Sequence, residues 1–151
     1  MADVVTPDVR SRMMSGIRST GTEPEMILRR GLHQAGFRYR LHARNLPGRP
    51  DLVFPRYHAV IFAHGCFWHG HDCHLFKWPS TRPEFWQTKI ARNRTVDARS
   101  EAALEEQGWR IGIVWECAVK GRFREPQDRV IASCAQWLRS GQNNLEIRGA
   151  A

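Results

Sequence analysis

Residues 64–74 constrain the fold of this chain more than any other stretch of its sequence. These eleven residues contain four histidines, two cysteines and the adjacent aromatics Phe67 and Trp68. Thiolate and imidazole groups are the protein ligands that zinc and related metals prefer. So many metal ligands and large rings are unusual for an ordinary surface loop. We therefore expect a fold in which this stretch holds a ligand and borders a reaction site.

Three residues of the stretch have the composition of a metal site, namely Cys66, His71 and Cys73. Cys117 follows a predicted core strand and can supply a fourth ligand. Three thiolates and one imidazole, all from the protein, are typical of a structural zinc site with no open position for catalysis. His74 is the alternative for the histidine position. Cys134 lies on the apolar face of a predicted helix, which favours a buried thiol.

Composition narrows the class of partner. The chain has 151 residues, the length of one domain with its own core. Lys and Arg number 23 against 15 Asp and Glu, so the net charge of +8 favours a polyanionic partner. The chain opens with no basic segment followed by an apolar run, and no stretch approaches the ~20 apolar residues of a membrane span. We expect a cytoplasmic protein with reduced cysteines.

The sequence divides into three parts. Residues 1–21 are basic and short of large aliphatic side chains, so they are either a frayed terminus or an arm that orders on DNA. Residues 22–140 have the patterns of a single folded domain. Residues 141–151 are expected to form a C-terminal tail.

Patterns in residues 22–64 predict a helix and then strands. Thr22 and Glu25 have the spacing of a capping box, and Gly36 ends the helix that they begin. Apolar residues at positions 37, 39 and 41 alternate as in a half-buried strand. The apolar runs 51–54 and 58–63 are close enough to form an antiparallel hairpin. Such a hairpin places Asp51 beside Ala63 and His64.

The second half continues the alternation of helices and strands. A capping-box pattern at Thr81 and Glu84 predicts a long, polar and basic helix that ends before Gly108. Residues 109–115 have the pattern of a buried strand. A last helix begins near Pro126, with a core face of Val130, Ile131, Cys134, Trp137 and Leu138. These elements predict an α/β fold with a mixed central sheet flanked by helices.

A carboxylate beside histidines suggests hydrolysis. Asp51 heads a predicted strand, where a charge needs a partner or a hard cation. Phosphodiester hydrolysis requires a divalent metal, a base for the attacking water and an acid for the leaving oxygen. One pocket can provide these groups from Asp51, the Ala63 carbonyl, His64 and His69. The alternative is a salt-bridged aspartate with surface histidines, and Glu25 can be only a helix cap.

Large rings among basic residues suggest contact with DNA. Phe67 and Trp68 lie in a polar loop, and Trp86 lies near basic residues of the long helix. Such rings are suited to insertion between base steps, where unstacking is least costly at a mismatch. Core packing is the alternative, and we adopt it for Trp109, Trp115 and Trp137.

The assembled sequence closely resembles the very short patch repair endonucleases, strand-specific nickases that act at T:G mismatches left by deamination of 5-methylcytosine. The resemblance covers most of residues 10–138. Its motifs are residues 46–51 (LPGRPD), 60–69 (VIFAHGCFWH), 85–90 (FWQTKI) and 108–117 (GWRIGIVWEC). It implies a fold related to the type II restriction endonucleases and a nick on the 5′ side of the mispaired thymine, which starts repair.

The resemblance also implies roles for individual residues. Asp51 and the main-chain oxygen of Ala63 would hold magnesium, and the acid and base roles would fall to His64 and His69. Glu25 would stand behind the metal, with Asp97 as a partner that orients the histidines. The structural zinc ligands would be Cys66, His71, Cys73 and Cys117. The rings that wedge into DNA would be Phe67, Trp68 and Trp86, with further DNA contacts from Met14, Lys89 and Asn93.

Two departures from the family pattern affect the metal site. Ala63 stands where the family commonly has threonine, although the contact through the carbonyl is retained. Residues 62–64 (FAH) replace the Glu-x-Lys of restriction folds, so one or two magnesium ions remain open.

The resemblance implies a monomer in the bacterial cytoplasm that acts on double-stranded DNA at the nucleoid, with a link to mismatch-repair proteins. Two other classes stay open. One is a zinc-containing DNA-binding module without catalysis. The other is a restriction-type nuclease that cuts both strands of a matched site.

Overall fold

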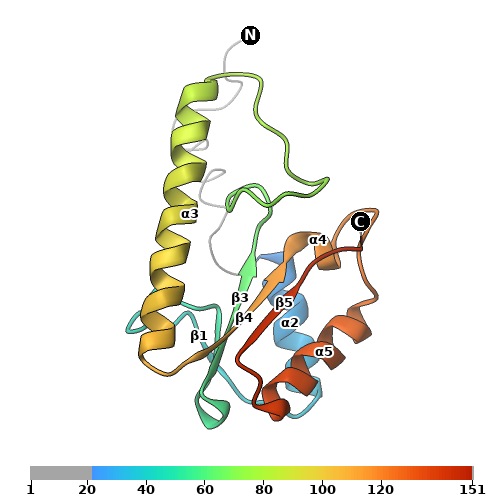
Figure 1. The fold of residues 1–151 in the computed structure, drawn as a ribbon. Helices are drawn as coiled ribbons and strands as arrows, with labels where there is room; N and C mark the ends of the chain where they lie inside the picture. Colours follow the sequence, from blue (N-terminus) through green and yellow to red (C-terminus); the bar gives the residue numbers. More distant parts are fainter. Residues whose placement is uncertain (1–21, 151) are drawn as a thin grey trace, which may run out of the picture.

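The structure, a computed structural model, describes residues 22–150 of the chain. A five-stranded mixed sheet lies at the centre of this part (Figure 1). The strands follow one another across the sheet in sequence order. The first three strands form two antiparallel pairs, β1 with β2 and β2 with β3: β1 (Arg40–Leu41), β2 (Leu52–Phe54) and β3 (Ala59–His64). The last two continue parallel to β3: β4 (Arg110–Trp115) and β5 (Asn144–Ile147). This arrangement confirms the predicted mixed α/β architecture.

Helices cover both faces of the sheet. Helices α2 (Glu23–Gln34) and α5 (Gln127–Ser140) lie on one side, and the long helix α3 (Pro83–Glu106) lies on the other (Figure 1). A four-residue helix, α4 (Glu116–Val119), follows β4 directly. None of the described helices is long and apolar enough to cross a membrane.

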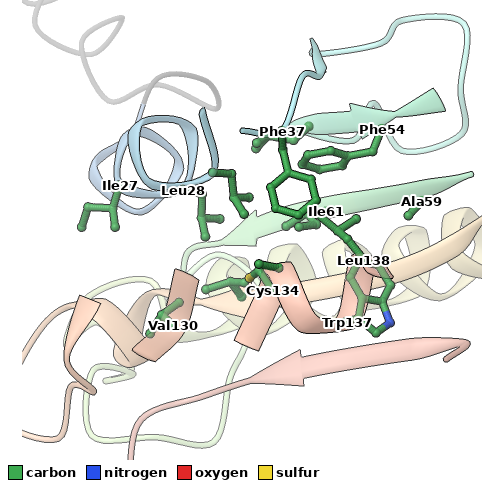
Figure 2. Packing of buried hydrophobic residues seen from close by; sticks show 14 of the residues in the cluster. Ile27, Leu28, Phe37, Phe54, Ala59, Ile61, Val130, Cys134, Trp137 and Leu138 are labelled. Carbon is green, nitrogen blue, oxygen red and sulfur yellow. The ribbon is translucent and has the colours of Figure 1, made fainter. Parts of the chain in front are cut away.

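The main core fills the space between the sheet and the pair α2 and α5. Figure 2 shows Phe37 and Phe54 above Ile61, with Leu138 and Trp137 of α5 facing them. Cys134 is fully buried in this cluster, as its helical position predicted. A smaller core on the opposite face joins Leu104 of α3 to the sheet. Two separate clusters are the expected result of a sheet whose strands are buried on both faces.

Helix α3 is anchored at few points. Among its 24 residues, Ile90 and Leu104 are buried and the rest retain solvent contact. Its first half extends beyond the sheet and runs beside the loop that follows β3 (Figure 1). The predicted long polar helix is therefore confirmed, and Gly108 follows it with a φ of +87°. A long face remains open to solvent beside the histidine-rich stretch.

The predicted hairpin is confirmed and sets the position of Asp51. The turn is the short 3-10 segment Pro55–Tyr57, and Leu52 pairs with Ile61 across the two strands. Parallel pairing of β3 with β4 then puts His64 opposite Trp115. The carboxyl ends of these two strands therefore meet at one edge, which brings residues far apart in sequence together.

Both capping-box predictions are wrong. Thr22 and Arg82 occupy the N-cap positions of α2 and α3, and neither makes a side-chain capping bond. Glu25 is instead fully buried and bonded to His42. The strand predicted from position 37 is shorter than expected, because β1 contains only Arg40 and Leu41.

Strand β5 and helix α4 were not predicted from the sequence. Residues 144–147, in the expected C-terminal tail, pair with β4. The expectations about residues 1–21, Met14 included, lie outside the described residues.

Candidate active site and metal centre

The carboxyl end of β3 opens into a cavity of about 410 Å³ between the sheet and α3. Its walls combine carboxylates and imidazoles, among them Asp51, His64, His69 and Asp97. The Ala63 backbone and His42 line the same space. The structure therefore gathers around one cavity four of the residues predicted as catalytic, Asp51, His64, His69 and Asp97.

Asp51 is held at the floor of this cavity by the backbone of β3. Its Oδ2 accepts a hydrogen bond of 2.7 Å from the amide of Ala63, and the residue is only 9% exposed. Burial raises the pKa of Asp51 to about 7, and nearby Glu25 adds to the rise while the Ala63 bond opposes it. A carboxylate in this position is stabilised by a cation close to it.

His64 and His69 stack on one another, with ring centroids 3.8 Å apart and planes 6° from parallel. The Nδ1 atom of His69 pairs with a carboxylate oxygen of Asp97 on α3. Burial, followed by the proximity of His69, lowers the pKa of His64 to about 3. The Nδ1 of His64 is buried and has no hydrogen-bond partner among residues 22–150. His64 is thus a neutral imidazole with an unsatisfied nitrogen.

A further acidic residue, Glu25 of α2, lies next to Asp51. It is fully buried, with Oε2 2.8 Å from Nε2 of His42 and 3.6 Å from Nη1 of Arg29. The potential ligand atoms of Glu25, His42 and Asp51 lie within 4.8 Å of one another. His42 was not predicted from the sequence, because nothing in its neighbourhood marks it as part of a motif. The cavity also borders Glu101, whose pKa is raised by burial.

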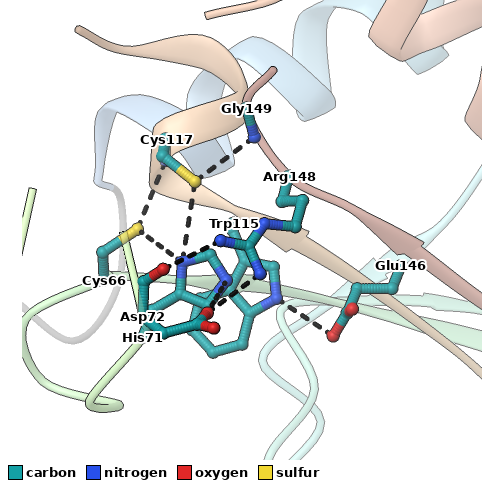
Figure 3. Close-up of polar contacts among 8 residues, drawn as sticks. All are labelled: Cys66, His71, Asp72, Trp115, Cys117, Glu146, Arg148 and Gly149. Atoms are coloured by element: carbon teal, nitrogen blue, oxygen red, sulfur yellow. Dashed lines mark hydrogen bonds and ion pairs between the residues drawn. The ribbon is translucent and has the colours of Figure 1, made fainter. Parts of the chain in front are cut away.

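A second group of metal ligands lies beside this cavity. The four predicted residues come together, with their ligand atoms within 4.8 Å of one another: Cys66, His71, Cys73 and Cys117. The Nδ1 of His71 lies 3.5 Å from Sγ of Cys66 and 3.6 Å from Sγ of Cys117 (Figure 3). Burial raises the pKa of the Cys66 and Cys117 thiols. His74, the alternative ligand, lies outside the group with its ring against Phe123.

Residues near the C-terminus surround this cluster, which the sequence pattern did not predict. The guanidinium of Arg148 donates two bonds of 2.9 Å to Asp72, the residue between two of the cluster's members (Figure 3). Trp115 stacks on the ring of His71 at 3.9 Å and donates to Glu146 through Nε1. Trp115 is therefore half-buried and packs against the cluster and not in the main core. Trp137 lies in the main core, as expected.

The three predicted DNA-contacting rings form one group. The ring of Phe67 lies 5.1 Å from Trp68 and 5.3 Å from Trp86, and Trp68 is 40% exposed. The Asn93 side chain donates to the carbonyl of Trp68 at 2.8 Å, which ties the loop to α3. Lys89, one turn before Asn93, is exposed on the same helix. Two further exposed rings, Trp78 and Phe85, lie nearby in the sequence and were not predicted as contacts.

These features define an α/β protein with a buried aspartate, paired histidines and a thiolate-rich cluster at one edge of its sheet. Residues 2–75 match the family model described as DNA mismatch endonuclease Vsr. The chain is 48% identical over 134 residues to the Type II nicking enzyme V.XorIIP of Xanthomonas oryzae pv. oryzae, covering 85% of this chain and 98% of that protein. It is 44% identical over 138 residues to the DNA mismatch endonuclease Vsr of Escherichia coli, covering 91% and 88%.

A further relative, the Type II nicking enzyme V.NmeAIP of Neisseria meningitidis, is 39% identical over 133 residues, covering 87% of this chain and 95% of the relative. Identity at this level extends along nearly the whole chain. The protein belongs to the Vsr family of DNA mismatch endonucleases.

Proposed function

We propose that this protein nicks one strand of DNA on the 5′ side of the mispaired thymine in a T:G mismatch that arises from deamination of 5-methylcytosine. The nick starts very short patch repair. The observation that carries the proposal is the position of Asp51 in one cavity with the His64 and His69 pair. Family membership supplies the substrate class, since relatives are named as mismatch endonucleases and nicking enzymes.

The residues around Asp51 suit magnesium. The N–H and C=O groups of one residue in a strand point toward the same neighbouring strand. The Ala63 amide donates to Asp51, so the Ala63 carbonyl points to the same side as Asp51. Carboxylate and carbonyl oxygens are the hard donors that Mg²⁺ requires. We assign the catalytic magnesium to Asp51 and the main-chain oxygen of Ala63. Glu25, buried next to Asp51, adds negative charge near the ion without a direct bond to it in this assignment. The ion supplies Lewis-acid polarisation of the scissile phosphate.

The histidines supply the proton transfers. His64 is neutral at physiological pH because burial depresses its pKa, so its ring nitrogens are not both protonated, and the same burial makes it a weak base in the metal-free site. Asp97 holds the ring of His69 through Nδ1, which leaves Nε2 of His69 for a water or a leaving oxygen. Asp97 is a positioning residue in this scheme. Measuring the pH dependence of the nicking rate for variants of His64 and of His69 assigns the acid and base roles to the two rings.

The thiolate-rich cluster is proposed as a structural zinc site. Three thiols and one imidazole converge within 4.8 Å, and burial raises the pKa of the Cys66 and Cys117 thiols. Zinc suits this soft donor set, and a set filled by protein ligands leaves no position for substrate. The cluster adjoins the loop that carries His69, Phe67 and Trp68. Its role is therefore to hold the catalytic and DNA-contacting residues in register.

DNA recognition is assigned to the exposed rings and the open face of α3. Phe67, Trp68 and Trp86 form one group that is able to wedge beside a mismatch, where base pairs unstack most easily. Lys89 and Asn93 are proposed to read the wobble pair, and Met14 in the arm of residues 1–21 to contact the minor groove. Residues 22–140 are proposed as the endonuclease domain, with β5 (Asn144–Ile147) completing its sheet. We propose that it acts as a monomer in the bacterial cytoplasm together with mismatch-repair proteins.

A nicking assay on strand-labelled duplexes tests the proposal. With magnesium, wild-type protein should cut only the thymine strand of a T:G duplex, and Asp51→Asn should abolish the cut while mismatch binding persists. Tight mismatch binding without any cut, unaffected by magnesium or by loss of His69, would identify a binding module. Breaks in both strands of a matched duplex would identify a restriction-type nuclease.

A further inference from the structure

Three segments of the chain converge behind the catalytic cavity. Helix α2 contributes Glu25, the residue after β1 is His42, and Asp51 directly precedes β2. The amide of His42 donates to the carbonyl of Asp51 at 3.1 Å, so β-type pairing holds these two residues side by side. Nε2 of His42 meets Oε2 of Glu25 at 2.8 Å. The imidazole is thus fixed to the proposed metal ligand by its backbone and to Glu25 by its ring.

The spacing of these groups fits a single cation. Around an octahedral ion with bonds of about 2.1 Å, adjacent ligand atoms lie about 3.0 Å apart and opposite ones about 4.2 Å apart. The Glu25–His42 separation of 2.8 Å matches an adjacent pair. The ligand atoms of all three residues lie within 4.8 Å of one another. This upper limit is close to the separation of about 4.2 Å between opposite ligands of such an ion.

Burial and charge favour a cation at this point. Glu25 is fully buried and Asp51 nearly so, whereas His42 is partly exposed and lines the cavity. Two buried carboxylates in close proximity require a positive charge or a shared proton. Arg29 approaches Glu25 from outside at 3.6 Å. His42 and Asp51 both line the cavity, so an ion that enters it meets these two residues first, and Glu25 is bonded to the His42 ring.

The backbone at His42 is held in an uncommon conformation. Its φ is +47°, in the left-handed region that few residues other than glycine adopt. Such conformations persist where the surrounding structure enforces them, and they concentrate at functional sites. Here the conformation occurs immediately after β1 and places the ring between Glu25 and the cavity.

We propose that His42 supplies a nitrogen ligand, and Glu25 a second carboxylate, to the cation assigned to Asp51 and the Ala63 carbonyl. A site of two carboxylates and one imidazole binds first-row transition-metal dications in preference to Mg²⁺, because imidazole is a better ligand for them than for magnesium. Mn²⁺ should therefore bind this protein more tightly than Mg²⁺. This inference rests on the proposed function only in placing a divalent cation at Asp51.

A positioning role for His42 predicts different behaviour. If its ring only holds Glu25 through the 2.8 Å bond, the cation has oxygen ligands alone. Glutamine at position 42 can still donate to Glu25, so such a variant keeps the positioning bond and removes the imidazole. The group His64, His69 and Asp97 is the other nearby source of nitrogen, since its ligand atoms also lie within 4.8 Å of one another.

The experiment uses zinc-loaded, DNA-free protein titrated with Mn²⁺ and read by electron paramagnetic resonance. The wild type should bind Mn²⁺ at least ~10-fold more tightly than Mg²⁺ and show nitrogen hyperfine coupling from an imidazole. His42→Gln should lose the coupling and ~10-fold in Mn²⁺ affinity, with little change for Mg²⁺. His33→Gln, at an exposed histidine of α2, is the matched control and should behave as wild type.

Persistence of the coupling in His42→Gln, or an unchanged preference for Mn²⁺, would overturn the proposal. Should that variant fail to fold, Mn²⁺-induced broadening of histidine resonances in wild-type protein decides the question. Broadening strongest at His42 supports the proposal, and broadening strongest at His64 and His69 refutes it.

Nicking assays separate this inference from the proposed function. Absence of nicking with either metal, while His42 still binds Mn²⁺, contradicts the function alone. Nicking with magnesium and no nitrogen ligand from His42 contradicts the inference alone.

Discussion

The amide of Gly149 donates a hydrogen bond to Sγ of Cys117 at 3.3 Å, so the end of the chain touches the thiolate-rich cluster directly. Beside it, Arg148 is bonded to Asp72 by two contacts. Hydrogen bonds to ligand sulfurs and to residues beside ligands orient a metal site. The segment after β5 therefore packs directly against the cluster.

Replacing Arg148 by alanine should loosen the cluster. The variant loses both bonds to Asp72, and we expect it to release zinc to a chelator several-fold faster than wild type. A chromophoric zinc indicator measures the release rate. Arg30→Ala, at an exposed arginine of α2, is the control. Equal release rates for all three proteins would show that Arg148 has no part in metal retention.

Gly70→Ala should destabilise the junction between the loop and α3. A Cβ at this position would lie 2.7 Å from Cγ2 of Ile90, and the φ of +62° is already unfavourable for alanine. Gly36→Ala carries the same kind of backbone penalty at φ +96° with no atom within 4 Å, so it isolates the clash. Urea unfolding should show Gly70→Ala less stable than Gly36→Ala by about 1–3 kcal/mol. Equal losses would mean that the loop moves aside freely.

Trp68→Ala should reduce mismatch discrimination. Its ring is exposed and groups with Phe67 and Trp86, so removal should weaken binding to a T:G duplex by about 1–3 kcal/mol and affect matched DNA less. Fluorescence anisotropy at fixed salt measures both affinities. Trp78→Ala tests an exposed ring that meets Phe76 instead. Equal losses on both duplexes would assign Trp68 to packing.

Metal-free protein should lose the stabilisation due to Asp51 as pH rises. The folded-state pKa of about 7 exceeds the ordinary value of 3.8, so the folded state binds the proton more tightly. The stabilisation is complete below about pH 4 and disappears as pH rises through 7. The free energy of unfolding of wild type relative to Asp51→Asn should fall over this range. Saturating Mg²⁺ should suppress the fall, and a flat difference without metal would contradict the shift.

The comparison with Asp51→Asn is needed because His64 acts in the opposite direction. The folded-state pKa of His64, about 3, lies below its ordinary value of 6.5, so its stabilising contribution is complete above pH 6.5. The contribution is lost as pH falls toward 3. In the wild type alone, the two trends largely cancel between these limits.

The sequence predicted the site where local pattern determines geometry. A short connection between two apolar runs forces the hairpin, and the hairpin brings Asp51 to Ala63. Ligand type and close spacing likewise identified Cys66, His71 and Cys73. The predictions that failed concern contacts between segments distant in the sequence. The bond from Glu25 to His42 spans 17 residues and needs a left-handed backbone at His42. The sequence pattern alone therefore suggested a helix cap for Glu25, and only the family resemblance placed it near the metal.

Strand β5 escaped prediction for a different reason. Its four residues alternate between exposed and half-buried positions at the edge of the sheet, and their hydrophobic pattern is too short to distinguish from a loop. The strand forms because β4 offers an unpaired edge. Arg148 and Gly149 could be placed near the cluster only once that pairing was known.

The cluster joins two points that are 51 residues apart, Cys66 and Cys117, and all of α3 lies between them. A cation bound there closes a loop around the helix that carries Trp86, Lys89 and Asn93, and closing such a loop removes conformational entropy from the unfolded chain. Loss of this cation would therefore destabilise the fold that positions α3 for contact with DNA. A metal ion that does not contact the substrate would in this way determine whether the protein recognises it.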